Sequence, residues 1–340
     1  MAIRELTDCD TRAWVGKERM HPPPNWHGVS PRVIARRGRP WNQDPNTGPW
    51  LDQPDAAEAI EEKLAADEVT EEEAGLLRDW LRDGYCIVRD AIPPEDHAVI
   101  DQYVRDLDAV WESDVPIPGL QVMSLHIRGR PPGPIDHEEL VTWPLERRLE
   151  LRDTQLWRIH FYHNYSAAAM RQSQAPKLLR MSSLILEDRP ALLSYIGFKW
   201  GSEVGIHQDY AANHIHPANR MVGVWLAGED VRPLAGPLGV FPGTHRVPSW
   251  PGWVNYPQTN LRTCHLDTRA QEERYLKDAI AGVERVPIPV SKGDAILTHG
   301  LLVHGGDKIQ DRSLTRYSSV LHYTVPGGDR RHEVVGPFNW

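Results

Sequence analysis

A histidine and an aspartate stand two residues apart in the segment GIHQDYAANHIH, at positions 207 and 209. Side chains at positions i and i+2 of an extended strand point to the same face, so His207 and Asp209 could reach one metal ion together. An imidazole nitrogen and a carboxylate oxygen suit Fe(II), and a second histidine would complete a facial set of three ligands. The triplet alone is weak evidence, because a chain with 16 histidines contains such spacings by chance.

The third ligand should come from a later strand, and the segment AILTHGLLVHGGDK offers His299 and His304. Strand alternation does not choose between these two histidines. His214 and His216 repeat the i, i+2 spacing of the first pair, but neither has a carboxylate beside it. We therefore expect His214 and His216 at the surface or at the mouth of a pocket.

A 2-oxoacid that chelates such an iron leaves its far carboxylate inside the barrel, where a bidentate arginine is the best partner. Arg312 and Arg316 follow the last histidines. Arg316 opens RYSSVLHYT, a predicted strand from which its side chain could point inward. Arg312 lies in the polar turn IQDRSL and is expected to be solvated.

The first half of the chain predicts helices around short strands. Residues 55–68 favour a helix by composition. Thr70 and Glu73 have capping-box spacing before a second helix that Gly84 ends. YCIVRDA predicts a strand, and PP at 93–94 opens a helix that runs to Trp111. Residues 115–150 look loop-like, LWRIHFYH predicts a strand, and the helical segment that follows is interrupted near Pro176.

From residue 192 onward, short apolar runs alternate with Gly, Pro, Asn and Asp. Many short strands at such intervals predict a β-sandwich or a jelly-roll barrel. Residues 250–285 break this pattern with a charged helical piece, TRAQEERYLKDAIAG, which we interpret as an insertion between strands.

Composition excludes several functional classes. The net charge of −9 argues against a nucleic-acid binder. The chain has no run of eighteen apolar residues and no apolar leader, so neither a membrane span nor a secretory signal is expected. Three cysteines without a CxxC pair fit a reducing cytoplasm.

Several motifs in order resemble the phytanoyl-CoA dioxygenase-like family of Fe(II)/2-oxoglutarate oxygenases. They are DWLRDGYCIVRDAIPPEDHAVI, the HQD triplet, VWLAGEDVRPLAGPLGVFPGTHR, KGDAILTHGLLVHGG and RYSSVLHYT. The resemblance covers residues from about 70 to 325. It implies a mainly β fold with flanking helices around a double-stranded β-helix (jelly-roll, cupin-like) core.

Position by position, the resemblance implies a metal site and a cosubstrate site. The implied Fe(II) ligands, which are also the catalytic set, are His207, Asp209 and His304. The implied 2-oxoglutarate contacts are Arg316, Trp225, Tyr195 and, as a weaker match, Arg158. One departure is Gly306, which stands where the family commonly has a serine that could support the cosubstrate.

The implied activity is hydroxylation of an unactivated C–H bond in a small metabolite or natural-product intermediate, with O2 consumed and succinate and CO2 released. Asp209 favours this over halogenation, because related halogenases have a small residue there. Desaturation or cyclisation with the same cofactors is an alternative. From other classes, a metal-binding jelly-roll module or a zinc hydrolase also remains open.

We expect residues 1–69 to form an irregular Pro- and Trp-rich arm plus a helix packing on the core. Residues 70–340 would then form the oxygenase domain, with its insertion at about 250–285. The expected partner is a small-molecule substrate, with no nucleic acid and no membrane, for a cytoplasmic monomer or homodimer. No basic cluster suited to the phosphates of coenzyme A stands out in the sequence.

Overall fold

The computed structural model describes residues 49–129, 133–213, 215–216, 219–253 and 266–329. The predicted arm at residues 1–48 and His214 lie outside the described residues. No helix in the described part of the chain combines the length and the apolar character needed to cross a membrane.

The first described elements are η4 (Trp50–Asp52), α2 (Ala56–Ala65), α3 (Glu71–Asp83) and β1 (Tyr85–Val88). The predicted capping box opens α3: Thr70 Oγ1 accepts the N–H of Glu73 at 3.2 Å, and Glu73 Oε2 accepts the N–H of Thr70 at 2.8 Å. Gly84 ends α3 in the left-handed conformation, with φ +79°. The buried side chains of η4 and α2, such as Ile60, belong to the same core as the rest of the molecule.

After η5 (Pro94–Asp96), α4 (His97–Glu112) runs as predicted. The prediction of a loop over residues 115–150 is wrong in part, since that region holds β2 (Gln121–Met123), β3 (Ile135–Asp136), α5 (His137–Leu140) and α6 (Leu145–Thr154). Most of α6 is charged and Arg148 is its single buried residue, so no apolar period marks the helix in the sequence. β4 (Arg158–His160), η6 (Tyr162–Asn164), α7 (Ala167–Gln172) and α8 (Pro176–Leu186) follow.

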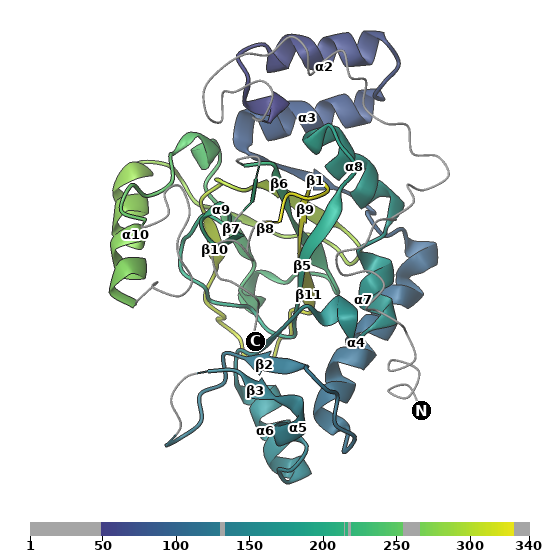
Figure 1. The fold of residues 1–340 in the computed structure, drawn as a ribbon, viewed down its shortest axis with the longest axis vertical. Helices are drawn as coiled ribbons and strands as arrows, with labels where there is room; N and C mark the ends of the chain where they lie inside the picture. Colours follow the sequence, from purple (N-terminus) through teal and green to yellow (C-terminus); the bar gives the residue numbers. More distant parts are fainter. Residues whose placement is uncertain (1–48, 130–132, 214, 217–218, 254–265, 330–340) are drawn as a thin grey trace.

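Two antiparallel sheets form the centre of the molecule (Figure 1). The larger has the order β1-β9-β6-β11-β5-β4-β2-β3 and the smaller the order β10-β7-β8. The strands not yet placed are β5 (Ala191–Phe198), β6 (Met221–Ala227), β7 (Leu238–Val240), β8 (Val286–Ile288), β9 (Ala295–His299), β10 (His304–Gly306) and β11 (Ser318–Thr324). This arrangement agrees with the predicted mainly β fold with flanking helices.

Short helices connect the strands: α9 (Tyr210–Asn213), η7 (Pro233–Ala235) and η8 (Thr244–Arg246). The predicted helical insertion is α10 (Leu266–Ala279), which lies beside β7 and β10 of the smaller sheet (Figure 1). Leu276 and Ile280, at the end of this helix, pack against Val303. The insertion therefore contacts the smaller sheet.

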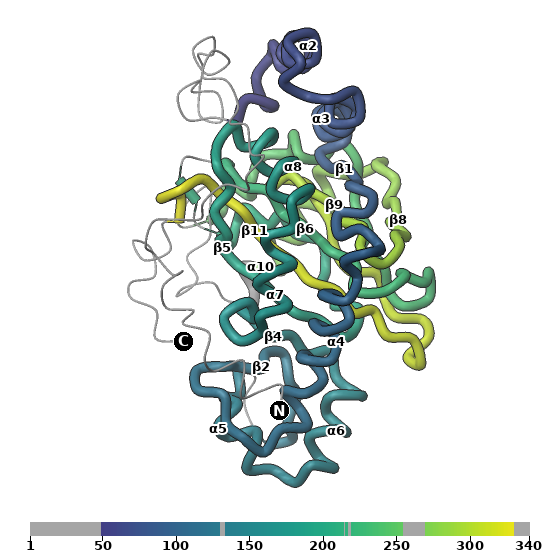
Figure 2. The backbone as a smooth tube through the Cα atoms, turned by 90° about the vertical axis from the view of Figure 1, so that its right-hand side faces the viewer, coloured from purple at the N-terminus to yellow at the C-terminus, as the bar shows by residue number. Residues whose placement is uncertain are grey.

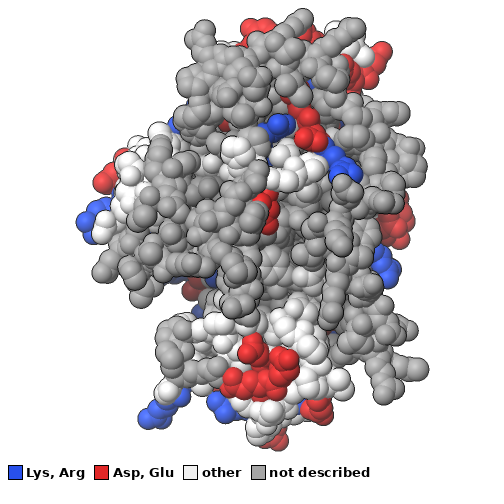
Figure 3. All heavy atoms as spheres, viewed as in Figure 1, with Lys and Arg blue, Asp and Glu red and all other residues white. Residues whose placement is uncertain are grey.

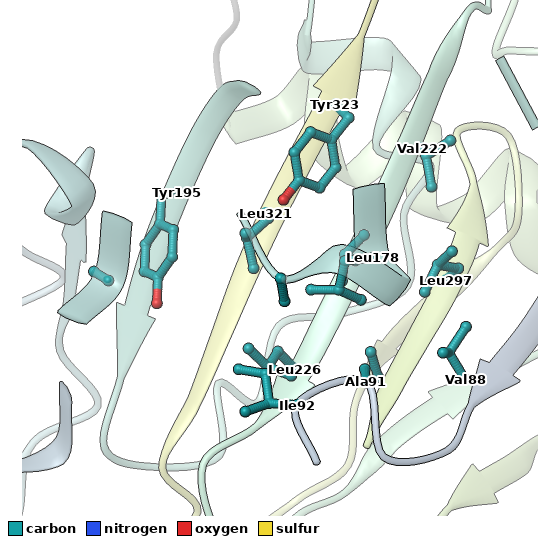
Figure 4. Packing of buried hydrophobic residues seen from close by; sticks show 14 of the residues in the cluster. Val88, Ala91, Ile92, Leu178, Tyr195, Val222, Leu226, Leu297, Leu321 and Tyr323 are labelled. Carbon is teal, nitrogen blue, oxygen red and sulfur yellow. The ribbon is translucent and has the colours of Figure 1, made fainter. Parts of the chain in front are cut away.

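Helices cover one face of the larger sheet, where α4, α7 and α8 run along its side (Figure 2). Figure 4 shows Leu178 of α8 among Val222 and Leu226 of β6 and Leu297 of β9. The opposite face of this sheet and residues of β7 and β10 line a cavity. Because neighbouring residues of a strand point to opposite faces, every second side chain of the central strands reaches that cavity.

Candidate metal centre

Backbone pairing brings two histidine-bearing segments together. His207 lies just outside the regular strands, and its N–H donates to the carbonyl of His304 at 3.0 Å, while the N–H of His304 donates back at 3.2 Å. The two imidazole centroids are 4.4 Å apart. Asp209 follows His207, and ligand atoms of all three residues lie within 4.8 Å of one another. The structure thus brings together the three residues predicted as metal ligands.

Hydrogen bonds fix the orientation of both imidazoles. Nδ1 of His207 lies 2.9 Å from the carbonyl of Gly205, and Nδ1 of His304 lies 2.9 Å from the carbonyl of Leu302. If each Nδ1–H donates to its carbonyl, both Nε2 atoms carry lone pairs. These Nε2 atoms lie 3.4 Å and 3.5 Å from the two carboxylate oxygens of Asp209. Two neutral imidazoles and one carboxylate are a donor set that fits Fe(II).

The charge states also suit metal binding. Although burial acts to raise the pKa of Asp209, His304, His322 and His207 hold it well below its usual range. Asp209 is therefore an ionised carboxylate. Burial lowers the pKa of His304, which keeps that imidazole neutral.

The other histidines considered as metal ligands, His299 and His216, lie away from the candidate metal centre. Nε2 of His299 lies 3.1 Å from Oδ1 of Asp52, and Nδ1 accepts the N–H of Leu301 at 3.0 Å. His299 therefore ties η4 to the turn after β9. His216 is exposed, as expected. Of the two late histidines that periodicity left open, only His304 reaches His207 and Asp209.

The three candidate ligands lie in the wall of a cavity of about 600 Å³, a size that suits a small molecule. Arg316 and Trp225 line the same cavity. Arg316 is 2% exposed, and its guanidinium donates from Nη1 to the carbonyl of Gly236 at 2.5 Å and lies 5.2 Å from the centroid of the Trp225 ring. Burial lowers the pKa of Arg316 to about 10, so it remains a cation. The predicted solvated arginine, Arg312, is 59% exposed.

The other two predicted cosubstrate contacts differ in their placement. Arg158, in β4, lines the cavity. Tyr195 does not: its hydroxyl donates to Gln172 at 2.5 Å on the helix-covered side of β5. Its neighbours Ser194 and Ile196 face the cavity instead. The structure therefore corrects the predicted contact of Tyr195, because alternation along β5 turns that side chain away.

Among the cavity residues that the sequence alone did not identify, two lie beside predicted site positions. His322, two residues beyond Val320 in β11, faces the cavity and approaches Asp209. Its even spacing from Arg316 was the available signal, since an inward arginine implies an inward residue six positions later. The second is Ser202, which lies beside Gly306: a Cβ added at Gly306 would lie 2.6 Å from the Ser202 hydroxyl. That hydroxyl belongs to a cavity-lining residue and stands close to where a serine at position 306 would begin.

Comparison with known proteins places this geometry in a family. The family model described as phytanoyl-CoA dioxygenase (PhyH) matches residues 80–311. Phytanoyl-CoA dioxygenase domain-containing protein 1 of Danio rerio is 31% identical over 186 residues, which cover 53% of this chain and 60% of that protein. Peroxisomal phytanoyl-CoA dioxygenase of Rattus norvegicus is 22% identical over 254 residues, covering 72% of this chain and 66% of that protein. The chain thus spans about 60% of the length of these relatives.

Solved structures show the same fold at low identity. The 2-oxoglutarate-dependent carbocyclase SnoK from nogalamycin biosynthesis has a TM-score of 0.52 and 14% identity, covering 76% of this chain and 86% of its own. The epimerase SnoN from the same biosynthesis has a TM-score of 0.51 and 14% identity, covering 75% and 83%. The predicted jelly-roll fold and the predicted family are confirmed. Fe(II), 2-oxoglutarate and O2, the cofactors of that family, are those that the motifs predicted.

Proposed function

Because this chain belongs to the phytanoyl-CoA dioxygenase family, we propose that it is a non-haem Fe(II)- and 2-oxoglutarate-dependent dioxygenase acting on a small molecule. The proposed reaction hydroxylates an unactivated C–H bond. One O2 and one 2-oxoglutarate are consumed, one oxygen atom enters the substrate and the other enters succinate, and CO2 leaves. A single observation carries the proposal: two imidazole Nε2 atoms turn toward one carboxylate in a cavity that also contains the buried cation Arg316.

His207, Asp209 and His304 would hold the iron. When bound, Fe(II) supplies the redox chemistry that couples O2 to decarboxylation of 2-oxoglutarate and oxidation of the substrate. The carbonyls of Gly205 and Leu302 would accept Nδ1–H and so fix the tautomer in which each Nε2 faces the metal position with its lone pair. A carboxylate at position 209 occupies a place that a halide ligand would need, which favours hydroxylation over halogenation.

Arg316 would bind the far carboxylate of 2-oxoglutarate. In the described part of the chain Arg316 forms no ion pair, and its Nε is buried without a hydrogen-bond partner. A buried guanidinium without a counter-ion costs free energy unless a ligand supplies the anion. Trp225 lies against the guanidinium and holds its plane. Leu238 and Val320 add an apolar wall that keeps water from the reacting groups.

The first test is spectroscopic and needs no substrate. Anaerobic Fe(II) and 2-oxoglutarate should give a weak visible charge-transfer band, since the cosubstrate chelates the metal. Arg316→Met should raise the 2-oxoglutarate concentration needed for half of this band by roughly tenfold or more, because a charge-assisted bidentate contact is lost. Arg312→Met is the matched control, since that arginine is exposed, and it should leave the titration unchanged.

Removal of a ligand separates the oxygenase from a zinc hydrolase. Asp209→Ala should abolish both the band and succinate release, because a carboxylate ligand is lost. Metal analysis of protein purified without added iron should show no tightly bound zinc. Addition of Fe(II) to that protein should then restore 2-oxoglutarate binding, measured by the charge-transfer band. Tightly bound zinc with no charge-transfer band after iron loading, and no succinate from any substrate pool, would contradict the proposed function.

A further inference from the structure

Besides the candidate metal ligands and Arg316, the charged residues that line the cavity are paired, with one exception. Nη1 of Arg269 lies 2.9 Å from Oε2 of Glu272, and Oε1 of Glu273 lies 2.7 Å from Nζ of Lys277. Arg158 has no ion pair and no hydrogen bond from its side chain in the described part of the chain. The charged cavity residue that lacks an ion pair is therefore the cation Arg158.

Arg158 is held in place by the sheet. It lies in β4, opposite Phe198 of β5 and Met123 of β2. Its Nε atom is buried without a partner. Burial and, to a lesser degree, the nearby Arg269 lower its pKa, and no acidic group acts in the other direction. Arg158 also borders a second hollow lined by Ser202 and Glu203, so it stands where the cavity meets a further opening.

The metal and cosubstrate do not use this charge. Fe(II) and Arg316 together carry three positive charges, while Asp209 and 2-oxoglutarate together carry three negative charges. The inner part of the cavity would therefore be neutral without Arg158. A mostly buried, unpaired guanidinium is unfavourable unless a ligand brings an anion. The positive charge of Arg158 requires one more negative group. The substrate is the one ligand not included in this sum of charges, so it is the expected source of that group.

We propose that Arg158 binds the carboxylate of the substrate, and that the substrate is a small free carboxylic acid rather than a coenzyme A thioester. This inference rests on the proposed function and names the substrate class of that same site. It departs from the weaker sequence-based expectation that Arg158 contacts the cosubstrate. The walls around it include Phe161, Ile196 and Val320, which suit an apolar carbon skeleton.

The cavity has too few unpaired cations to bind the phosphates of coenzyme A. The 3′-phosphate and diphosphate of coenzyme A need several cations, as other polyphosphate sites do. Of the other basic residues here, Arg269 and Lys277 are already paired with glutamates of α10. On the face seen in Figure 3, described basic side chains are scattered and acidic ones gather over the lower part, near β3 and α5. One unpaired arginine matches a monocarboxylate.

The experiment uses the full chain loaded with Mn(II), which does not support turnover, and with 2-oxoglutarate. The probes are hexanoate, phenylacetate and L-leucine, their amides, and hexanoyl- and phenylacetyl-coenzyme A. Ligand-observed NMR measures the affinity for each probe, and calorimetry measures Mn(II) and 2-oxoglutarate. Acids should bind, while their amides and thioesters should bind at least about tenfold more weakly.

Arg158→Met should weaken binding of the acids by about tenfold or more, and should change the 2-oxoglutarate affinity by less than about threefold. Arg158→Lys should restore part of the acid affinity, because the charge returns without the fork geometry. Arg105→Met, at an exposed arginine of α4 that lines neither hollow, is the matched control and should change neither. Thermal unfolding of each variant checks that the fold is intact, and the lysine variant keeps the test valid if the methionine variant is unstable.

Three results would overturn the inference while leaving the proposed function standing: no acid binds to protein that holds Mn(II) and 2-oxoglutarate, amides or thioesters bind as well as acids, or Arg158→Met weakens 2-oxoglutarate as much as Arg316→Met does. The last result would assign Arg158 to the cosubstrate. Failure of the unmodified protein to bind Mn(II) and 2-oxoglutarate would overturn the proposed function, and this inference with it.

Discussion

Nε2 of His322 lies 3.2 Å from Oδ2 of Asp209, so a third histidine approaches the carboxylate of the candidate metal centre. His322 is 4% exposed, and its Nδ1 lies 2.7 Å from Oγ of Ser194 on the neighbouring strand β5. The chain Ser194–His322–Asp209 therefore links two strands of the larger sheet to one oxygen of the carboxylate. A hydrogen bond to that oxygen fixes the rotation of the carboxylate and leaves the other oxygen oriented for a metal.

We predict that His322→Phe weakens metal binding. The ring volume is kept, but Asp209 loses the donor that holds its carboxylate, and loss of such a partner typically costs about 10- to 100-fold in metal affinity. Calorimetric titration with Mn(II) measures this change. Ser194→Ala should act in the same direction with a smaller effect, and the exposed His216→Phe should have none. An unchanged Mn(II) affinity in His322→Phe would show that the carboxylate is oriented without this histidine.

Gly223 in β6 leaves the space in which Asp209 lies. A Cβ added at Gly223 would overlap Oγ1 of Thr298 and lie 3.3 Å from Oδ2 of Asp209. Both neighbours belong to the cavity wall, so the added methyl group must displace one of them. We predict that Gly223→Ala lowers Mn(II) affinity by roughly tenfold.

Gly75 provides the matched control for this substitution. It lies inside α3, and an added Cβ would meet no atom within 4 Å. Gly75→Ala should therefore raise the free energy of unfolding by about 0.5–1 kcal/mol without changing metal affinity. Equal Mn(II) affinities in Gly223→Ala and the unmodified protein would mean that Thr298 yields freely and that the space at Gly223 is not needed.

The sequence identified the site best where chemistry fixes residue type. A carboxylate two residues after a histidine, and an arginine opening a strand, are required by metal and anion binding, and these residues meet in the cavity. The choice between His299 and His304 as the third ligand could not be made from local periodicity. It depends on a turn and on the pairing of His304 with His207, about 100 residues away in the chain.

Other features of the structure could not be predicted from the sequence, each for a different physical reason. The resemblance implied a cosubstrate contact for Tyr195, but a one-residue shift along a strand reverses the face, and its neighbour Ser194 is the residue that faces the cavity. The helix α6 (Leu145–Thr154) buries a charged residue, Arg148, so its pattern does not resemble an amphipathic helix. The balance of charges around Arg158 depends on the fold, which brings β4 and the ion-paired helix α10 (Leu266–Ala279) to one cavity although they lie far apart in the sequence, and no motif records this.

A buried ion pair joins the first described helix to the core. Nζ of Lys63 in α2 lies 3.1 Å from Oε1 of Glu187 at the end of α8, and these side chains are 1% and 3% exposed. Lys63 also lies 5.0 Å from the centroid of the Trp50 ring. We predict that Lys63→Met lowers the free energy of unfolding by about 3–5 kcal/mol, because removal of one partner of a buried ion pair is strongly destabilising.

The double variant Lys63→Met, Glu187→Leu tests the cause of this loss. When both charges are replaced by apolar groups, most of the stability should return, since neither desolvated charge remains. Urea unfolding of the two single variants and the double variant gives the coupling free energy. Purely additive losses in the double variant would show that the two residues act independently and that the helix is held by its apolar contacts alone.

His245 should make the folded protein sensitive to acid. Burial, together with His299 and Arg246, lowers the pKa of His245 to about 3, while Asp52 acts weakly in the other direction. The unfolded chain has an ordinary imidazole with a pKa of about 6.5. Below that pH the unfolded state takes up a proton that the folded state does not, so the free energy of unfolding falls as the pH falls. Above pH ~6.5 this residue adds no pH dependence.

We therefore predict that His245 contributes a loss of up to about 1.4 kcal/mol per pH unit between roughly pH 6 and pH 4. Urea unfolding at pH 7, 6, 5 and 4, performed on metal-free protein, measures the slope. His245→Phe keeps a ring against Gly84, where His245 packs, and removes the titrating group. Its slope should be shallower by that amount, while the exposed His216→Phe should keep the original slope. Parallel slopes for His245→Phe and the unmodified protein would mean that His245 takes up its proton in the folded state, through a local opening around the η8 turn (Thr244–Arg246).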